Sequence, residues 1–174
     1  LLAQVNLWED RRRAVSGFSG GMRQRFGIAQ ALLGDPRLVI VDEPTAGLDP
    51  AERGRFYNLL GEIGEQVVVL LSTHIVEDVR QLCTRMAIVA DGHVVAEGVP
   101  DDLVSALDGR VWRRTTDRHE AEAIGAPHTV LSTQMHAGKT RLRILSAVAP
   151  DHEWEPVAPE LEDVYFATLQ RGPA

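Results

Sequence analysis

The chain has 174 residues, of which 44% are apolar and 25% are charged, so it has room for one medium domain, or for a small domain with an appendage. Its formal net charge of −7 argues against a nucleic-acid partner, because proteins that bind nucleic acids present a net basic face to the phosphates. The single cysteine, Cys83, excludes an intrachain disulfide and a paired-cysteine metal site, and no apolar run reaches the roughly 18 residues of a membrane-spanning helix.

Helical patterns occupy the beginning of the chain. Residues 1–8 have the pattern that is typical of the end of an amphipathic helix. Ser19 can cap a second helix, which we expect to run from Gly20 to about Leu33 with apolar side chains at helical spacing. Gly34 then ends this helix, because glycine readily adopts the left-handed conformation that follows a last helical turn.

Two short apolar runs predict parallel strands. Residues 37–42 and 67–72 each contain a continuous apolar run that is rich in β-branched side chains, as strands buried on both faces of a sheet should. Between them Asp49 can cap a helix that has Pro50 in its first position. A further helical pattern begins at Ile75, and this alternation of strands and helices predicts an α/β sheet with parallel central strands.

The pattern changes in the C-terminal part of the chain. Asp91 and Gly92 separate two apolar runs and predict a hairpin, and residues 101–107 predict a short helix. Alternating stretches that predict strands follow at residues 111–116, 129–133 and 140–145, and a helical tail begins after Pro159. We interpret residues 109–174 as a small α+β appendage.

Two adjacent carboxylates, Asp42 and Glu43, follow the first apolar strand. Ligands of α/β proteins bind at the carboxyl edge of the parallel sheet. Successive residues near the end of a strand point to different sides, so one carboxylate can serve a Mg²⁺ ion while the other addresses a water molecule. The alternative is a pair of solvated acids in a turn.

Three other short elements carry candidate functional residues. Ser19, Gly20 and Gly21 open a helix, where free backbone N–H groups and small side chains let a phosphate approach, although a plain serine cap has the same sequence. Asp49 is expected to cap its helix in any case. His74 follows the second strand and can hydrogen-bond a terminal phosphate, whereas a lone histidine there is more often structural.

Together, in this order and spacing, the four elements closely resemble those of the ABC ATPase family. They match its signature loop, its Walker B strand with the catalytic glutamate, its D-loop and its switch histidine, at Phe18–Met22, Leu38–Glu43, Ala46–Asp49 and Ser72–His74. Phe18 and Met22 stand where the commonest signature has leucine and glutamine. This variant, with the tail at residues 159–165, is similar to the drug- and antibiotic-export branch of the family.

The resemblance covers roughly residues 1–105 and implies the fold. These residues would form the C-terminal part of a P-loop-type ABC ATPase domain, with a parallel-centred sheet, flanking helices and part of the helical subdomain. The appendage, residues 109–174, would follow as an accessory α+β region. The family's P-loop would lie upstream of residue 1, so we expect the chain alone to bind and hydrolyse ATP poorly or not at all.

The resemblance also implies the activity. The protein would be the ATP-hydrolysing subunit of an ABC transporter, using ATP and Mg²⁺ to drive export through an integral membrane permease, at the cytoplasmic face of the membrane. Glu43 and His74 would be catalytic, and Asp42 would hold Mg²⁺ through water. Two such domains would stack head to tail as a homodimer.

In that dimer, Ser19, Gly20 and Gly21 would contact the ATP bound to the opposite subunit, and Asp49 would belong to the D-loop. Two alternatives stay open: an ABC ATPase of DNA repair or translation, and a non-functional remnant. Residues 1–15 are too few to test for the long heptad stretches of DNA-repair members.

One segment imitates a P-loop, at His136–Thr140. Its Gly-Lys-Thr ending is right, but Thr133 stands where the first glycine of the motif belongs. A P-loop also precedes a helix, whereas residues 140–145 alternate like a strand. We therefore predict a hairpin turn at residues 137–139.

Overall fold

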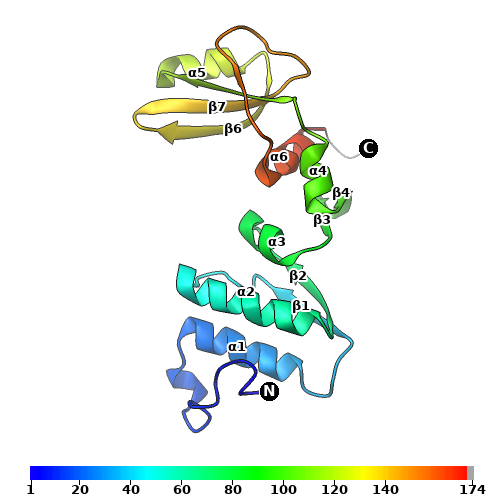
Figure 1. Ribbon diagram of the computed structural model, residues 1–174. Helices are drawn as coiled ribbons and strands as arrows, with labels where there is room; N and C mark the ends of the chain where they lie inside the picture. The colour runs from blue at the N-terminus through cyan, green and yellow to red at the C-terminus, as the bar shows by residue number, and fades with distance from the viewer. Residues whose placement is uncertain (172–174) are drawn as a thin grey trace. The chain divides into compact units, whose positions relative to one another are not determined.

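The computed structural model describes residues 1–171, and the chain divides into two compact units, Leu1–Leu82 and Cys83–Ala174 (Figure 1). The division falls inside the range that resembles an ABC ATPase, and the domain boundary near residue 105 stays a prediction. Every helix in the described part of the chain is too short or too polar to cross a bilayer.

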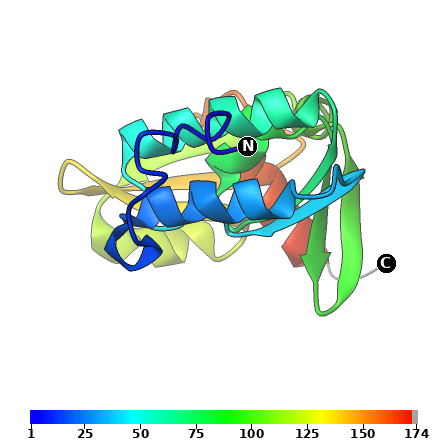
Figure 2. The same ribbon diagram turned by 90° about the horizontal axis from the view of Figure 1, so that it is seen from below.

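The first unit contains a parallel pair of strands, which confirms the α/β class. β1 (Leu38–Asp42) pairs with β2 (Val68–Ser72), and α2 (Pro50–Gly64) connects them. A 3-10 turn (η1, Val15–Gly17) precedes α1 (Gly20–Ala31), and α3 (Val76–Leu82) follows β2. Viewed from below, α1 and α2 run side by side (Figure 2). The parallel register brings Asp42 opposite Ser72, so the carboxyl ends of both strands lie at one edge.

One apolar cluster forms the core of this unit. Phe56 is the largest of its fully buried side chains. The cluster draws on the N-terminal turns, α1, β1 and α2, with the members Val5, Leu7, Phe18, Ile28, Ala29, Leu32, Val39, Leu48, Phe56, Leu59, Leu60 and Ile63. At roughly 25 cal/mol for each Å² of buried apolar surface, such a cluster is the main source of the unit's stability.

The expected helix at residues 1–8 is wrong, because this segment forms turns. Asn6 has a φ of +55°, in the left-handed region, which interrupts a right-handed helix. The amphipathic pattern has another cause: Val5 and Leu7 are buried in the core cluster while their neighbours are exposed. Alternating burial of a short irregular segment produced a pattern that we interpreted as helical.

Burial of the strands on both faces is also a wrong prediction. Val39 is buried, but Ile40, Val68 and Leu70 are 68%, 67% and 57% exposed. One face of the two-stranded sheet packs on the core cluster, and no element of the first unit covers the other face. A continuous apolar run predicts a sheet with both faces covered. The run does not say whether the covering elements belong to the same compact unit as the strands.

The second unit begins with a hairpin of β3 (Met86–Ala90) and β4 (His93–Gly98), followed by α4 (Pro100–Ser105). Asp91 and Gly92 have φ values of +50° and +77°, as a two-residue hairpin turn requires, so the hairpin prediction is confirmed.

A four-stranded antiparallel sheet in the order β6-β7-β5-β8 forms the rest of this unit. Its strands are β5 (Val111–Thr116), β6 (Thr129–His136), β7 (Lys139–Leu145) and β8 (Glu155–Pro156). α5 (Arg118–Gly125) packs on β7, and α6 (Leu161–Arg171) contacts β6, β4 and α4. The sequence predicted the three longer strands and α6, but neither α5 nor β8.

The segment whose sequence resembles a P-loop forms the predicted hairpin turn. Ala137 and Gly138 have φ values of +50° and +79° between β6 and β7, and Lys139 begins β7. Thr140 is buried, and its hydroxyl contacts the Met135 sulfur at 3.4 Å. No helix follows, so this segment lacks the structure of a phosphate-binding loop.

A buried ion pair anchors α6 to the sheet. Arg143 on β7 donates from Nε to Asp163 Oδ1 at 3.0 Å, and the Asp163 side chain is only 3% exposed. The hydrogen bond to Asp163 raises the pKa of Arg143 above its ordinary value. Glu160 adds a second carboxylate 3.4 Å from Arg143 Nη1.

Asp163→Ala should therefore lower the free energy of unfolding by about 3 kcal/mol, because it leaves the Arg143 guanidinium buried without its main partner. Urea denaturation of the 174-residue polypeptide measures this loss. Glu155→Ala is the matched control, since its pair with Arg113 is exposed and should contribute less than about 1 kcal/mol. Equal losses in the two variants would contradict the assignment of Arg143–Asp163 as an anchor.

Candidate functional site

The residues predicted to be functional all lie in the first unit. Asp42 is the last residue of β1 and Glu43 follows it, and Ser72 is the last residue of the neighbouring strand β2, with Thr73 and His74 directly after it. Ser19 to Gly21 open α1 and Asp49 precedes α2. The parallel pairing of β1 and β2 therefore brings the carboxylates and the histidine together, as the sequence predicts.

Glu43 and His74 contact each other across the ends of the two strands. Nδ1 of His74 lies 2.8 Å from Glu43 Oε1, and the His74 backbone N–H donates to the same oxygen at 3.2 Å. The second carboxylate oxygen, Glu43 Oε2, is buried and accepts no hydrogen bond from the described residues. A buried carboxylate oxygen is costly to leave unpaired, so Oε2 is a strong acceptor for a polar group that enters here.

The backbone of Glu43 is also unusual. Its φ of +45° lies in the left-handed region, which a residue with a long side chain seldom occupies. The Glu43 N–H donates to Ser72 O at 2.9 Å, which continues the β1–β2 ladder past the end of β1. Strained backbone of this kind persists only where surrounding contacts fix it, and it is common at functional sites.

Asp42 faces solvent beside Ser72, whose hydroxyl donates to Asp42 Oδ1. Among residues 1–171 no group of three or more acidic, histidine or cysteine side chains could hold a metal by itself. Mg²⁺ does not need such a cage, because it keeps several waters and binds through one or two carboxylates and substrate phosphates. A lone exposed carboxylate beside a hydroxyl therefore fits a Mg²⁺ ion held mainly by water and phosphate.

Ser19 caps α1, as predicted. Its Oγ accepts from the Met22 N–H at 3.2 Å. A Cβ on Gly20 would have no heavy atom within 4 Å, so this position faces open space. A Cβ on Gly21 would lie 1.7 Å from Glu52 Oε2, so a larger residue here would displace the end of the Glu52 side chain, which pairs with Arg25.

The hydrogen bonds of the described residues do not join the start of α1 to Glu43 or His74. They join α1 to the segment before α2 instead, because Gln24 Nε2 donates to Ala46 O at 3.3 Å. Asp49 caps α2 by accepting from the Glu52 N–H at 2.8 Å, so this expectation is confirmed. Ser19, Gly20 and Asp49 are exposed and are left available to a second molecule.

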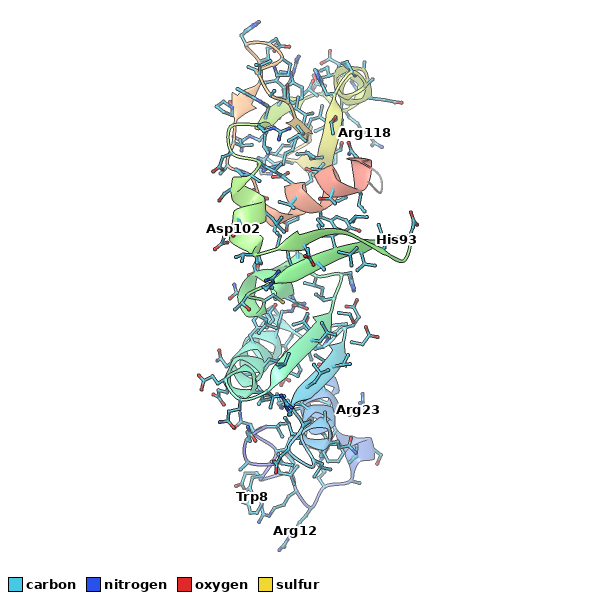
Figure 3. All side chains as sticks on the ribbon, turned by 90° about the vertical axis from the view of Figure 1, so that its right-hand side faces the viewer. Trp8, Arg12, Arg23, His93, Asp102 and Arg118 are labelled. Carbon is cyan, nitrogen blue, oxygen red and sulfur yellow. The ribbon has the colours of Figure 1, made fainter. Side chains whose placement is uncertain are left out.

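The arginine-rich segments make local contacts on the surface. Arg11 stacks over the Trp8 ring at 4.5 Å, and Arg12 projects from the same N-terminal turns (Figure 3). In the second unit Arg113 and Arg114 pair with acids of the residue 151–155 segment. Arg11, Arg113 and Arg114 therefore have partners close by on the surface of their own unit.

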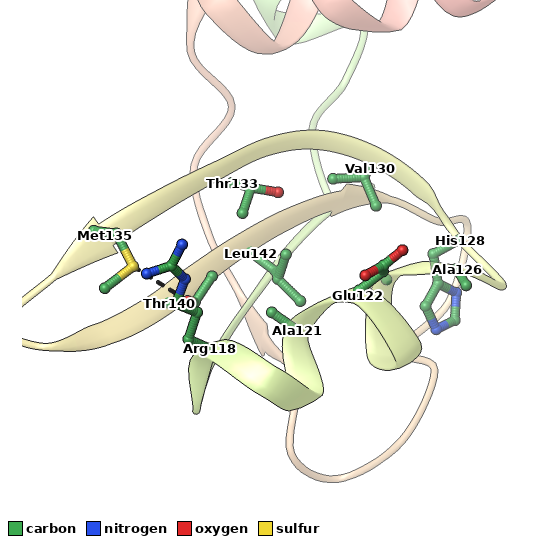
Figure 4. Close-up of a pocket in the computed structure, with 11 residues that line it drawn as sticks. Arg118, Ala121, Glu122, Ala126, His128, Val130, Thr133, Met135, Thr140 and Leu142 are labelled. Atoms are coloured by element: carbon green, nitrogen blue, oxygen red, sulfur yellow. Dashed lines mark hydrogen bonds between the residues drawn. The ribbon is translucent and has the colours of Figure 1, made fainter.

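A depression of about 660 Å³ lies in the second unit between α5 and the face of β6 and β7 (Figure 4). Ala121 and Leu142 form its apolar floor, and Arg118 and Glu122 border it. Arg118 and Glu122 are both exposed, so neither provides a buried charge that would select a ligand.

Sequence reasoning missed one residue near the site, Asp78. This aspartate is 0% exposed and accepts hydrogen bonds from the hydroxyls of Thr45, Tyr57 and Thr73. Glu77 and Asp78 together look like ordinary acids in the first turn of a helix, where the helix dipole favours them. The only signal was the position of Thr45 and Thr73, each close in sequence to a predicted catalytic residue.

Comparison with known proteins gives consistent matches. The sequence model of the family described as "ABC transporter" matches residues 1–46. The Nod factor export ATP-binding protein I of Rhizobium meliloti (strain 1021) is 40% identical over 117 residues, which are 66% of this chain and 35% of that protein. A daunorubicin resistance ATP-binding protein of Streptomyces coeruleorubidus is 35% identical over 152 residues, 87% of this chain and 48% of that protein.

Solved structures agree on the fold. A crystal structure of the ADP conformation of an ATP-binding cassette of an ABC transporter matches with a TM-score of 0.55 at 23% identity, covering 61% of this chain and 42% of that chain. A nucleotide-free ATP-binding cassette matches with a TM-score of 0.54 at 24% identity, over 56% and 39% of the two chains. The chain spans between a third and a half of the length of the curated relatives described above.

Proposed function

The chain belongs to the ABC transporter ATP-binding family, and from that membership we propose that it is part of the ATP-hydrolysing subunit of a transporter that exports its substrate through a membrane permease. The two relatives named for Nod factor export and daunorubicin resistance support transport and, more specifically, export. The subunit would act at the cytoplasmic face of the membrane. The term full-length ATPase denotes a chain in which residues 1–174 are preceded by a P-loop half such as the family has.

The contact between Glu43 and His74 carries this proposal. One oxygen of Glu43 is held by His74, the other has no hydrogen-bond partner among the described residues, and the side chain as a whole is 35% exposed. A carboxylate fixed in this way can orient a water molecule and take its proton as the water attacks the γ-phosphate of ATP. Mg²⁺, held by Asp42 through water, would neutralise charge on the phosphates.

His74 has a second role in the proposal. Its side chain is 76% exposed, so the ring nitrogen that does not contact Glu43 can reach a γ-phosphate. Only the doubly protonated ring donates from both nitrogens at once. With ATP bound, the ring therefore either carries two protons or leaves Glu43 for the phosphate.

The exposed start of α1 supports a composite site in a head-to-tail dimer of two such subunits. Ser19, Gly20 and Gly21 would bind the γ-phosphate of ATP on the opposite subunit, because free N–H groups at a helix N-terminus attract anions. Asp49, which caps α2 and is exposed, would lie in the D-loop at the same interface.

The proposal is tested by isolating the full-length ATPase from its own cells. We expect its ATPase activity in the membrane fraction, in a complex with an integral membrane protein. Recovery with ribosomes or DNA would instead support the alternative, an ABC ATPase of translation or DNA repair. Absence of ATPase activity in a folded full-length chain would support a non-functional remnant.

A polypeptide of residues 1–174 alone should bind MgATP weakly. Its only Gly-Lys-Thr sequence forms the β6–β7 hairpin, so the backbone cradle that holds phosphates is missing from these residues. In a thermal-shift titration, MgATP below its Kd would add less than about 0.4 kcal/mol of stability, so we expect little movement of the Tm. A saturable shift in the millimolar range that Lys139→Ala abolishes would overturn the assignment of this hairpin.

A further inference from the structure

Asp78 lies at the centre of a buried hydrogen-bond cluster next to the proposed catalytic pair. Thr45 Oγ1 lies 2.8 Å and 2.6 Å from the two carboxylate oxygens, and Thr73 Oγ1 donates to Asp78 Oδ2 at 2.9 Å. Tyr57 donates its phenolic proton to Oδ1 at 2.7 Å. Thr45 and Asp78 are both 0% exposed, so the bonds between these two residues are shielded from water.

The two threonines are attached to the two halves of the site. Thr45 is two residues after Glu43 and starts the turn in which the Leu48 N–H donates to Thr45 O at 3.1 Å. Thr73 directly precedes His74, and its hydroxyl also accepts from the Ile75 N–H at 2.9 Å. A single carboxylate therefore connects the loop after β1 with the loop after β2.

The chemistry of the cluster gives it little freedom. A carboxylate accepts hydrogen bonds and donates none, so each hydroxyl must point its proton at Asp78. Burial, together with the bond to Asp78, raises the pKa of the Tyr57 phenol above its ordinary value, so Tyr57 keeps the proton that it donates. Bonds to a charged group are stronger than those between neutral groups, and a buried carboxylate strongly resists their loss.

We propose that Asp78 is a positioning residue for ATP hydrolysis, which holds Glu43 and His74 in contact by binding Thr45 and Thr73 together. This inference rests on the proposed function. The left-handed backbone of Glu43 needs contacts that fix it, and the Asp78–Thr45 bonds supply one of them two residues away. Asp78 is not itself near the reacting atoms in this assignment; it acts through the loops on either side.

The test uses matched substitutions in the full-length ATPase. Thr45→Val removes the hydroxyl at nearly constant volume, and Thr45→Ser keeps it. We expect Thr45→Val and Asp78→Asn to lower kcat between about tenfold and a hundredfold, because misplacement by about 1 Å has effects of that size. The KM for ATP should stay within about twofold, and Thr45→Ser should restore most of kcat.

Tyr57→Phe is the control for a purely structural role. It removes the α2 contact to Asp78 but leaves both threonines bound, so it should lower the Tm while kcat stays within about twofold of the unmodified protein. If kcat in all variants simply followed the loss of Tm, with Thr45→Val no worse than an equally destabilised Tyr57→Phe, the positioning role would be refuted. Thermal denaturation shows that each variant is folded at the assay temperature.

Glu43→Gln in the same assay separates this inference from the proposed function. If Glu43→Gln is inactive while Thr45→Val and Asp78→Asn behave like Tyr57→Phe, only the positioning role fails. If Glu43→Gln hydrolyses ATP normally, the proposed catalytic role fails, and the positioning role fails with it.

Discussion

Glu43→Gln should reduce the kcat of the full-length ATPase by about a hundredfold to ten-thousandfold and leave ATP binding intact, because general-base catalysis contributes on that scale. Glutamine keeps the shape of the side chain, and its amide oxygen can still accept from the His74 N–H. At the buried Oε2 position, however, the amide places a donor where the carboxylate offers an acceptor. Water can no longer give up its proton there.

Two measurements check this prediction. ATP binding by fluorescence or calorimetry should give a Kd close to that of the unmodified protein, while single-turnover hydrolysis should be slow. Asp42→Asn is the matched control, since it changes the adjacent acid at the same strand end. We expect this variant to need more Mg²⁺ for half-maximal activity. Hydrolysis at the normal rate by Glu43→Gln would exclude Glu43 as the catalytic carboxylate.

The elements that the sequence predicted best are those with a local cause. Ser19 and Asp49 cap their helices through bonds to N–H groups three residues later, and such bonds depend only on neighbouring residues. The Asp91-Gly92 turn likewise needs only two residues with positive φ. The meeting of Glu43 and His74 was predictable because parallel strands bring their carboxyl ends to the same edge.

The features that the sequence did not predict depend on contacts over long sequence distances. Thr45 and Asp78 are 33 residues apart, and neither residue type indicates by itself that it is buried. α5 is only eight residues long, and its apolar side chains are small apart from Ile124, so it was missed. The exposed face of β1 and β2 is set by which elements pack on the sheet, and strand composition does not say whether those elements belong to the same compact unit.

Gly20→Asp should inactivate the full-length ATPase if the start of α1 receives a γ-phosphate, but it should be harmless if Ser19 only caps a helix. The fold itself tolerates the change: a Cβ at Gly20 meets nothing within 4 Å, and an acid in the first turn suits the helix dipole. A charge facing a docked phosphate at short range costs several kcal/mol, so about a hundredfold loss or more is expected. Gly20→Asn separates bulk from charge and should lose much less.

Combining two variants in one dimer tests whether each ATP site is shared between two subunits. In a mixed dimer of Gly20→Asp and Glu43→Gln subunits, both lesions fall on one site, because the ATP of the Glu43→Gln subunit faces the altered helix start. The other site is intact. Mixing the two nearly inactive homodimers should restore about a quarter of the normal ATPase activity, since half of the dimers are mixed and each has one intact site of two.

This recovery requires that one intact site can turn over alone, and that subunits exchange during mixing. Co-expression of the two variants with different affinity tags, followed by two-step purification, isolates the mixed dimer and removes the second condition. Its activity should then approach half of normal, while each homodimer stays inactive. Normal activity in the Gly20→Asp homodimer would show that Ser19, Gly20 and Gly21 only begin the helix and bind no phosphate. An inactive mixed dimer, with both variants folded and binding ATP on their own, would instead mean either that the altered helix start acts on its own subunit's ATP or that the two sites turn over only together.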